Sequence, residues 1–301
     1  MNAARTVSAI LNGQWAIEPT YAINNMPLIL SILEGNFKGW GKNPDGEPVA
    51  YSLGDTNMVQ TYYRMERTIE KLRESPKGSI LEINIEHAIT RNDNCGDMGS
   101  LSIAKLVNEV NAMENIAGVL FCMNTPGGQV SGMASAISAL QNCSKPTTTY
   151  IEDGISASAG YWLASQTDNI YVSSKRSSVG SLGAYVTLMN MKARLETAGI
   201  NILEIYSRYS TDKNGTYRAA IDGNEEPMKD DLDYVVEGFV EDVKAGRGIN
   251  AVAGEGPFTG KMYYAEEAEA IGLIDGIRTK EQVVAELVSK SNNGSKTRYF
   301  V

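Results

Sequence analysis

Two turns rich in glycine and serine carry the residue types that covalent catalysis on a carbonyl needs. Residues 124–128 (Asn-Thr-Pro-Gly-Gly) follow a short apolar run, and Ser158 stands among small residues before a predicted helix. Glycines let consecutive backbone N–H groups approach an anion, because no Cβ blocks the way. A serine at a strand-to-helix turn can expose its hydroxyl as a nucleophile, with the N–H of Ala159 aimed at the same point. Taken singly, the first turn also fits a plain connection, and Ser158 an ordinary helix N-cap.

A serine nucleophile needs a base, and the histidine content limits the choice. His87 is the one histidine; it precedes Ser158, at or just after a predicted strand, and we interpret it as a core or edge residue. A lysine that burial deprives of its proton near neutral pH is the remaining base, so the composition permits a Ser-Lys dyad. A single histidine also argues against a histidine-rich metal site, and no cofactor is predicted.

The composition excludes several other classes of protein. The 301 residues include 27 basic and 36 acidic side chains, and a net charge of −9 argues against binding to a nucleic-acid backbone. No run approaches the ~18 apolar residues of a membrane span, and no secretory signal is evident. The three cysteines (Cys95, Cys122 and Cys143) are widely spaced, which fits a reducing compartment. A cytoplasmic location is therefore expected.

Strands and helices alternate along most of the chain, which predicts an α/β fold with a mainly parallel sheet. The patterns predict strands at 79–85, 118–123, 147–151, 169–172 and 201–206, and helices at 55–75, 102–114, 129–142, 159–165, 187–198 and 228–244. We divide the chain into an N-terminal helical segment and linker (1–50), an α/β domain (51–280), and a C-terminal helix end with a flexible tail (281–301). The first of these contains an apolar cluster at 26–33.

Four motifs resemble, in order, those of the signal peptide peptidase A family of serine peptidases. They are residues 124–128, Ser-Ala-Gly-Tyr at 158–161, Val-Gly-Ser-Leu-Gly at 179–183, and the stretch 258–275 that begins Phe-Thr-Gly and ends Gly-Leu-Ile-Asp. Residues 11–19 (Leu-Asn-Gly-Gln-Trp-Ala-Ile-Glu-Pro) resemble the leader of the bacteriophage head-maturation, or prohead, protease branch. The resemblance covers about residues 8–280 and implies a Clp/crotonase-type fold of repeated ββα units.

The resemblance also implies roles for single residues. Ser158 matches the nucleophile, and Gly128 and Ala159 match the backbone donors of the oxyanion hole. Lys213, just past the last predicted strand, matches the base. Ser181, in the Gly-Ser-Leu-Gly motif, is a candidate to orient the lysine amine.

The chain departs from the family pattern at two positions. Ala159-Gly160 stands where the family often has two glycines, and Ser210 where a glycine usually precedes the lysine. A rival alignment places Arg218 at the base position; because arginine is not deprotonated in proteins, that alignment implies an inactive protein. Lys175 is a poorer candidate that fits a surface lysine.

The implied function is a serine endopeptidase that uses a Ser-Lys dyad and needs no metal or cofactor. The resemblance further implies a homo-oligomer, with the lysine supplied by the same or a neighbouring subunit. Its polypeptide substrate would be a phage capsid or scaffold protein, processed in the bacterial host cytoplasm or the prohead. Two alternatives stay open: a catalytically inactive assembly or scaffold protein, and an acyl-CoA enzyme of the crotonase kind. The second would use Glu152 or Asp153, although the motif order does not match.

Overall fold

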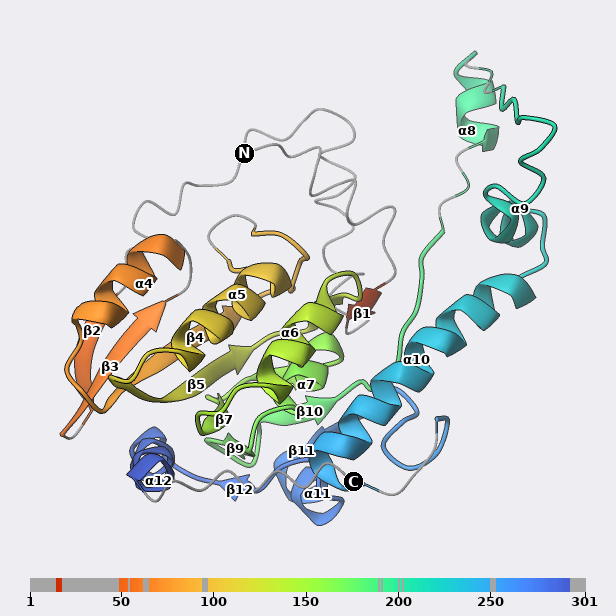
Figure 1. Ribbon diagram of the computed structural model, residues 1–301. Helices are drawn as coiled ribbons and strands as arrows, with labels where there is room; N and C mark the ends of the chain where they lie inside the picture. The colour runs from red at the N-terminus through yellow and green to blue at the C-terminus, as the bar shows by residue number, and fades with distance from the viewer. Residues whose placement is uncertain are drawn as a thin grey trace.

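A seven-stranded sheet forms the centre of the molecule (Figure 1), with the strand order β12-β9-β7-β5-β4-β3-β2. The computed structural model describes residues 15–17, 49–53, 55–61, 65–93, 97–188, 190, 192–199, 201, 203–249 and 253–292. The predicted features at 26–33 and 293–301 lie outside the described residues. The strands are β2 (Val49–Leu53), β3 (Thr56–Thr61), β4 (Ser79–Glu86), β5 (Ile116–Asn124), β7 (Thr147–Ile151), β9 (Asn169–Val172) and β12 (Gly276–Ile277). The edge strand β2 is antiparallel to β3 and the other neighbouring pairs are parallel, which confirms the predicted α/β class.

Successive side chains of the central strands point to opposite faces of the sheet, and each face is covered by helices (Figure 1). Leu81 and Phe121 pack in the core beneath α4 (Met65–Glu74), α5 (Ser100–Asn111) and α6 (Met133–Gln141). Ile80 and Leu120 pack in a second cluster, to which α12 (Lys280–Asn292) contributes Val283, Val284 and Leu287. Each such fully buried side chain stabilises the fold by about 1.5–3 kcal/mol. These strands are consequently buried on both faces, which explains their continuous apolar runs.

Short strands follow the carboxyl ends of the long ones and build the part of the fold that carries the site. Strand β6 (Gly127–Gln129) follows β5, β8 (Ile155–Ala157) follows β7, and β10 (Ser178–Gly180) follows β9. Strand β8 is parallel to β10, which is antiparallel to β11 (Met262–Tyr264). Helix α6 comes after β6, and α7 (Ala159–Ala164) comes after β8. The units β5-β6-α6 and β7-β8-α7 agree with the predicted ββα repeat.

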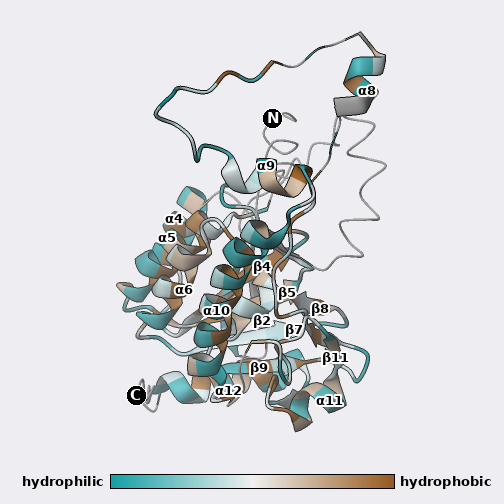
Figure 2. Ribbon diagram, turned by 90° about the vertical axis from the view of Figure 1, so that its right-hand side faces the viewer, coloured by the Kyte–Doolittle hydropathy of each residue, from teal (hydrophilic) through white to brown (hydrophobic). Residues whose placement is uncertain are grey.

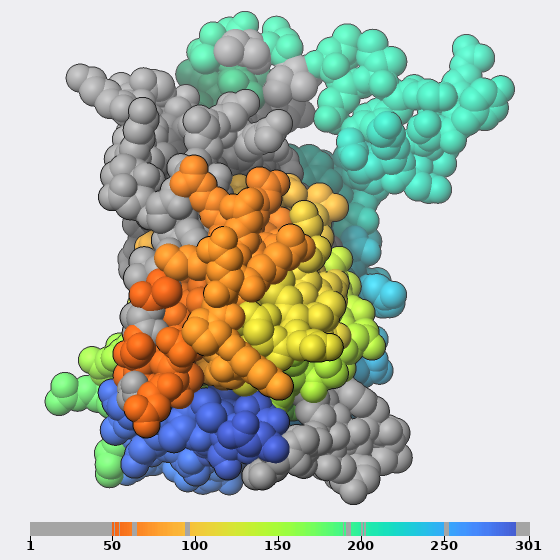
Figure 3. Space-filling view, turned by 60° about the vertical axis from the view of Figure 1, so that its left-hand side comes forward, coloured from red at the N-terminus to blue at the C-terminus, as the bar shows by residue number. Residues whose placement is uncertain are grey.

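The segment that contains α8 (Lys192–Thr197) and α9 (Gly215–Ile221), which we call the arm, stands away from the sheet (Figures 1 and 3). It joins the body through α10 (Glu226–Arg247), whose buried residues Phe239, Val240 and Val243 all lie in its second half. The ring of Phe239 stacks on Trp162 of α7 with centroids 4.5 Å apart. Helix α11 (Ala265–Ala270) packs below the small strands.

The arm carries apolar residues (brown in Figure 2), and three of their side chains are exposed although a monomer would normally bury such residues. Leu203 is 82% exposed, Ile205 84% and Tyr209 97%. The predicted strand at 201–206 is wrong, because residues 201 and 203–206 pair with no strand. Alternating apolar residues form a strand only beside another edge, and the described arm offers none.

The predicted helix at 55–75 is wrong in its first half. Residues 56–61 form β3, because Met58 and Val59 are both buried on opposite faces of the sheet, and the helix α4 begins at Met65. The predicted helix at 187–198 is described only from Lys192 to Thr197. For residues 56–61, pairing with the neighbouring strand therefore determined the secondary structure more than the periodicity of their own sequence did.

Candidate active site

Ser158 lies at the junction of β8 and α7 in a strained backbone conformation. Its φ is 53° and its ψ −119°, a region that a side chain with a Cβ rarely adopts. Hydrogen bonds hold the junction on both sides: Ser158 N–H donates to the Gly180 carbonyl at 2.8 Å, and Trp162 N–H donates to the Ser158 carbonyl at 2.8 Å. The residue is 1% exposed within the described chain. This is the geometry expected of a nucleophile on a sharp strand-to-helix turn.

The turn at 124–128 lies directly beside this junction. Thr125 N–H donates to the Ile155 carbonyl at 2.9 Å, and Ala157 N–H donates to the Thr125 carbonyl at 3.0 Å. A Cβ added at Gly160 would lie 2.4 Å from Thr125 Cγ2, so glycine at this position lets α7 approach the turn. The structure therefore brings together the two turns that the sequence singled out.

The backbone of Ile89 lies against one side of Gly128. Its backbone bridges Ile89, and a Cβ at Gly128 would lie 1.9 Å from the Ile89 carbonyl oxygen. Glycine is required here, because the side chain of any other residue would push the backbone of residue 128 away from the backbone of Ile89. Ile89 escaped the sequence reasoning; the only signal for it was its position shortly after the strand at 79–85.

The loop at 180–183 borders Ser158 as well. Ser158 Oγ donates to the Gly183 carbonyl at 3.3 Å, a long hydrogen bond. Ser181 has a φ of 54°, is 6% exposed, and its N–H donates to the Lys261 carbonyl at 2.8 Å. Ser158 and Ser181, two of the predicted site residues, thus sit in adjoining strained turns.

Lys213 is not brought to Ser158 within one chain. It is exposed, in the turn that precedes α9 on the arm. Helix α9 itself holds Arg218, whose guanidinium lies 4.8 Å from the Tyr206 ring and whose Nη2 donates to the Thr211 carbonyl at 2.8 Å. Arg218 therefore packs against the loop that carries Lys213.

Two other lysines near the small sheet are paired with carboxylates. Lys261 Nζ donates a 2.6 Å hydrogen bond to the Glu267 carboxylate, and this hydrogen bond raises the pKa of the lysine. Lys175 forms an ion pair with Glu266, and this hydrogen bond likewise raises the pKa of Lys175. A raised pKa is the opposite of what a neutral lysine base needs, which fits the interpretation of Lys175 as a surface residue.

His87 directly follows β4 with a φ of 64°, and its side chain is 65% exposed. Its Nδ1 lies 3.3 Å from Asp97 Oδ2; burial raises the pKa of Asp97, although the histidine lowers it. The His87 carbonyl accepts a 2.6 Å hydrogen bond from Thr125 Oγ1. His87 thus lies exposed at the carboxyl end of a central strand, neither in the core nor on an edge strand, and its backbone supports the turn at 124–128.

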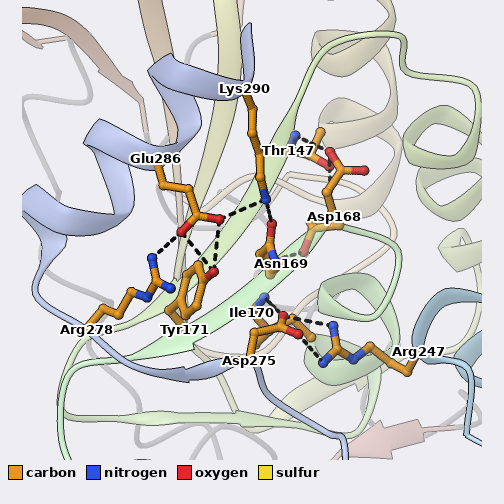
Figure 4. A network of polar contacts seen from close by, with 11 residues as sticks. Thr147, Asp168, Asn169, Ile170, Tyr171, Arg247, Asp275, Arg278, Glu286 and Lys290 are labelled. Carbon is orange, nitrogen blue, oxygen red and sulfur yellow. Dashed lines mark hydrogen bonds and ion pairs between the residues drawn. The ribbon is translucent and has the colours of Figure 1, made fainter. Parts of the chain in front are cut away.

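A polar network fixes the elements beneath α7 (Figure 4). Arg247 of α10 makes two hydrogen bonds to Asp275, at 2.9 and 3.0 Å, and Asp275 also accepts the Ile170 N–H at 2.7 Å. Tyr161 of α7 donates its hydroxyl to the Leu273 carbonyl at 2.6 Å. These contacts anchor α7, and with it Ser158 and the Ala159 N–H, to the main sheet.

Within the described ranges, no three His, Cys, Asp or Glu side chains cluster as metal ligands would. In the part of the chain that the structure covers, no helix has the length and apolarity needed to cross a membrane.

The strained turn at Ser158 lies beside the turn at 124–128, on a mainly parallel sheet. This arrangement defines the class: an α/β protein with the backbone geometry of a serine hydrolase. The comparison with known proteins gives the family. The model of peptidase family S49 matches residues 139–293, and the chain belongs to this family. The resemblance is thereby confirmed at the level of the family.

Named relatives come from archaea, bacteria and bacteriophage. MJ0651 of Methanocaldococcus jannaschii, which is named as a protease, is 27% identical over 189 residues, covering 62% of this chain and 60% of the relative. Capsid assembly protease C of Escherichia phage lambda is 29% identical over 163 residues, covering 53% and 36%. The chain thus spans less than two thirds of the length of either relative.

Among solved structures, a ClpP1 mutant of Listeria monocytogenes gives a TM-score of 0.45 at 11% identity, covering 71% of this chain and 98% of that one. So low a score carries no argument about the site.

Proposed function

We propose that this chain is a serine endopeptidase with Ser158 as nucleophile and Lys213 as base. The observation that carries the proposal is the buried, strained Ser158 at the junction of β8 and α7, next to the glycine turn. A non-glycine residue held at such a φ costs about 1–3 kcal/mol, which the surrounding hydrogen bonds must offset. The N–H groups of Gly128 and Ala159 would hold the oxyanion, each contributing about 3 kcal/mol to transition-state stabilisation.

The proposed base requires a second copy of the chain. A lysine acts as a base when it is desolvated, and Lys213 is exposed on the arm. The arm also exposes Leu203, Ile205 and Tyr209, an apolar set that fits an interface better than water. In the proposed homo-oligomer, the arm packs on a neighbouring subunit, buries its apolar side chains, and delivers Lys213 to that subunit's Ser158. Ser181, beside Ser158, would orient the amine.

The proposed reaction proceeds through an acyl-enzyme. Lys213 Nζ takes the Ser158 hydroxyl proton while Oγ attacks a peptide carbonyl carbon. The tetrahedral oxyanion collapses, the C–N bond breaks, and the Lys213 ammonium returns the proton to the leaving amine. Water then hydrolyses the ester, with Lys213 accepting and returning a proton.

The finer proposal for the substrate is a phage or prophage capsid or scaffold polypeptide, cut in the bacterial cytoplasm or prohead. It is supported by the phage-type motif at residues 11–19 and by the 29% identity to the capsid assembly protease of phage lambda. The test is to mix the purified chain with phage capsid and scaffold proteins. A Ser158-dependent shortening of one of them would support the proposal, and their survival beside cleaved casein would refute it.

The first experiment measures intact mass after fluorophosphonate treatment, with casein cleavage in parallel. We expect labelling and cleavage in wild type and His87→Ala, and neither in Ser158→Ala or Lys213→Ala. Lys229→Ala is the matched control, because Lys229 is also an exposed lysine and pairs with Glu226. No labelling of the assembled wild type would refute the peptidase and favour the inactive scaffold protein. Labelling that survives in Lys213→Ala would keep Ser158 and exclude Lys213.

A mixture of two inactive variants tests the position of the base. If Lys213 acts in the neighbouring subunit, Ser158→Ala and Lys213→Ala subunits complement each other after dissociation and reassembly. Random assembly of equal amounts should restore about a quarter of wild-type activity, because half of the sites keep the serine and half of those receive the lysine. No recovery, with oligomers formed normally, would exclude the exchange of Lys213 between subunits.

A further inference from the structure

Strand β6 has two edges, and one of them is filled by Ile89. Ile89 N–H donates to the Gly127 carbonyl at 2.8 Å, and Gln129 N–H donates to the Ile89 carbonyl at 2.8 Å. Backbone groups of successive residues in a strand point to opposite edges. Because Gly127 and Gln129 face Ile89, the N–H and C=O of Gly128 face the other edge.

That other edge is occupied by the chain itself. Strand β1 (Trp15–Ile17) pairs antiparallel with β6, and Ala16 stands opposite Gly128. Since the backbone of Gly128 faces this edge, the backbone of Ala16 meets the N–H that the proposed function assigns to the oxyanion hole. A side chain at position 128 would clash with the Ile89 carbonyl, so the close approach of Ile89 to this position requires glycine.

A bound peptide that places its carbonyl on Gly128 N–H must run along this same edge, because Ile89 fills the opposite one. Extended peptides bind to open strand edges by adding a strand. We propose that residues 15–17 occupy in cis the strand position of an extended substrate, so that the chain covers its own site. This inference rests on the proposed function, which supplies the role of Gly128.

The occupant is suited to exchange with a substrate. Strand β1 has three residues and pairs with β6 at three positions, so it offers few hydrogen bonds to be broken. Each backbone hydrogen bond contributes modestly in water, which makes a short strand displaceable by a longer peptide. Residues 15–17 therefore act as a competitor that raises the KM of the site and leaves its kcat unchanged.

Proline substitutions at adjacent positions test this. In Ala16→Pro the backbone N–H that faces Gly128 is lost, and a proline cannot form this pair. Ile17→Pro is the matched control, because the N–H of residue 17 points away from β6 and the proline favours an extended residue 16. We expect Ala16→Pro to lower the KM for a fluorogenic peptide about tenfold at constant kcat, and Ile17→Pro to change it less than twofold.

The readouts separate this proposal from the proposed function. Fluorophosphonate labelling of Ser158 shows whether the serine is active in each variant. If wild type is labelled and the three KM values agree, the strand proposal fails and the peptidase stands. Unlabelled wild type means that the peptidase itself fails.

A second measurement needs no activity. In full-length Ser158→Ala, hydrogen exchange of the Gly128 amide should be slowed at least about tenfold relative to Ala16→Pro/Ser158→Ala, because β1 covers the amide. Equal exchange in both proteins would overturn the proposal even if proline at 16 disturbed catalysis for another reason.

Discussion

Gly160 is the residue at which the two turns of the site meet, and Gly160→Ala tests that contact. A Cβ at this position would lie 2.4 Å from Thr125 Cγ2, and both residues are buried. An extra methyl group in a packed interior costs about 1–3 kcal/mol. Alanine in a helix returns about 0.5–1 kcal/mol relative to glycine. The free energy of unfolding should therefore fall by about 1–2 kcal/mol.

Thr125→Ser should reverse this loss, because it removes the methyl group that the new Cβ meets. The serine keeps the hydroxyl that donates to the His87 carbonyl at 2.6 Å and accepts from Gly127 N–H at 3.2 Å. Alone, Thr125→Ser costs about 1 kcal/mol for the lost buried methyl. In the double variant the Cβ at 160 fills that space, so the two substitutions should be non-additive by about 1–2 kcal/mol.

Urea unfolding measures the stabilities, and fluorophosphonate labelling measures the site. Labelling of Gly160→Ala should slow by at least about tenfold, because Ser158 and the Ala159 N–H move with α7, and should recover in the double variant. Gly238→Ala in α10 is the control; its Cβ would meet nothing within 4 Å, so it should gain about 0.5–1 kcal/mol. The reasoning is refuted if Gly160→Ala behaves like Gly238→Ala, or if Thr125→Ser brings no recovery.

Two further predictions concern the polar contacts drawn in Figure 4, those of Arg247 with Asp275 and of Tyr171 with Glu286. Arg247→Met should lower the free energy of unfolding by about 3 kcal/mol, because Arg247 is 7% exposed and its loss leaves the Asp275 carboxylate without its cation. Lys229→Met is the control at an exposed ion pair. In the same urea titrations it should change the free energy of unfolding by less than about 0.5 kcal/mol. Burial and the hydrogen bond to Glu286 raise the pKa of Tyr171 to about 12. Because this folded-state pKa is raised, the stabilisation is complete below the ordinary value of about 10 and is lost as the pH rises toward 12. Tyr171→Phe should flatten the fall in stability over that pH range, and an unchanged slope would contradict the assignment.

The elements predicted correctly are those whose sequence pattern fits only one type of secondary structure. Strand β5 is a continuous apolar run between turn residues, and α10 shows a helical apolar period over many residues. The parts predicted wrongly depend on distant neighbours. Residues 56–61 become a strand because β4 lies beside them, whereas residues 201 and 203–206 do not, because within the described chain no strand pairs with them.

The site divides in the same way. The backbone of Ser158 follows from local sequence, since small residues at 156–160 allow the strained turn and the close approach of Thr125. Ile89 and β1 could not be predicted, because their pairing with β6 joins segments far apart in the chain. The sequence pattern of a segment indicates its own secondary structure. It does not indicate which strand edge another segment will pair with.

Lys213 shows the consequence for function. A conventional site would bury its base with its nucleophile in one core, yet here the body of the protein holds Ser158 while the arm exposes Lys213. In the proposed homo-oligomer, association would bury Leu203, Ile205 and Tyr209 and would also desolvate the lysine. Under that proposal, assembly and activation are one event. The activity per subunit should rise with protein concentration in step with the oligomeric fraction, and Ile205→Ser should shift both curves together. Full activity of a monomeric Ile205→Ser variant would place the base within the chain.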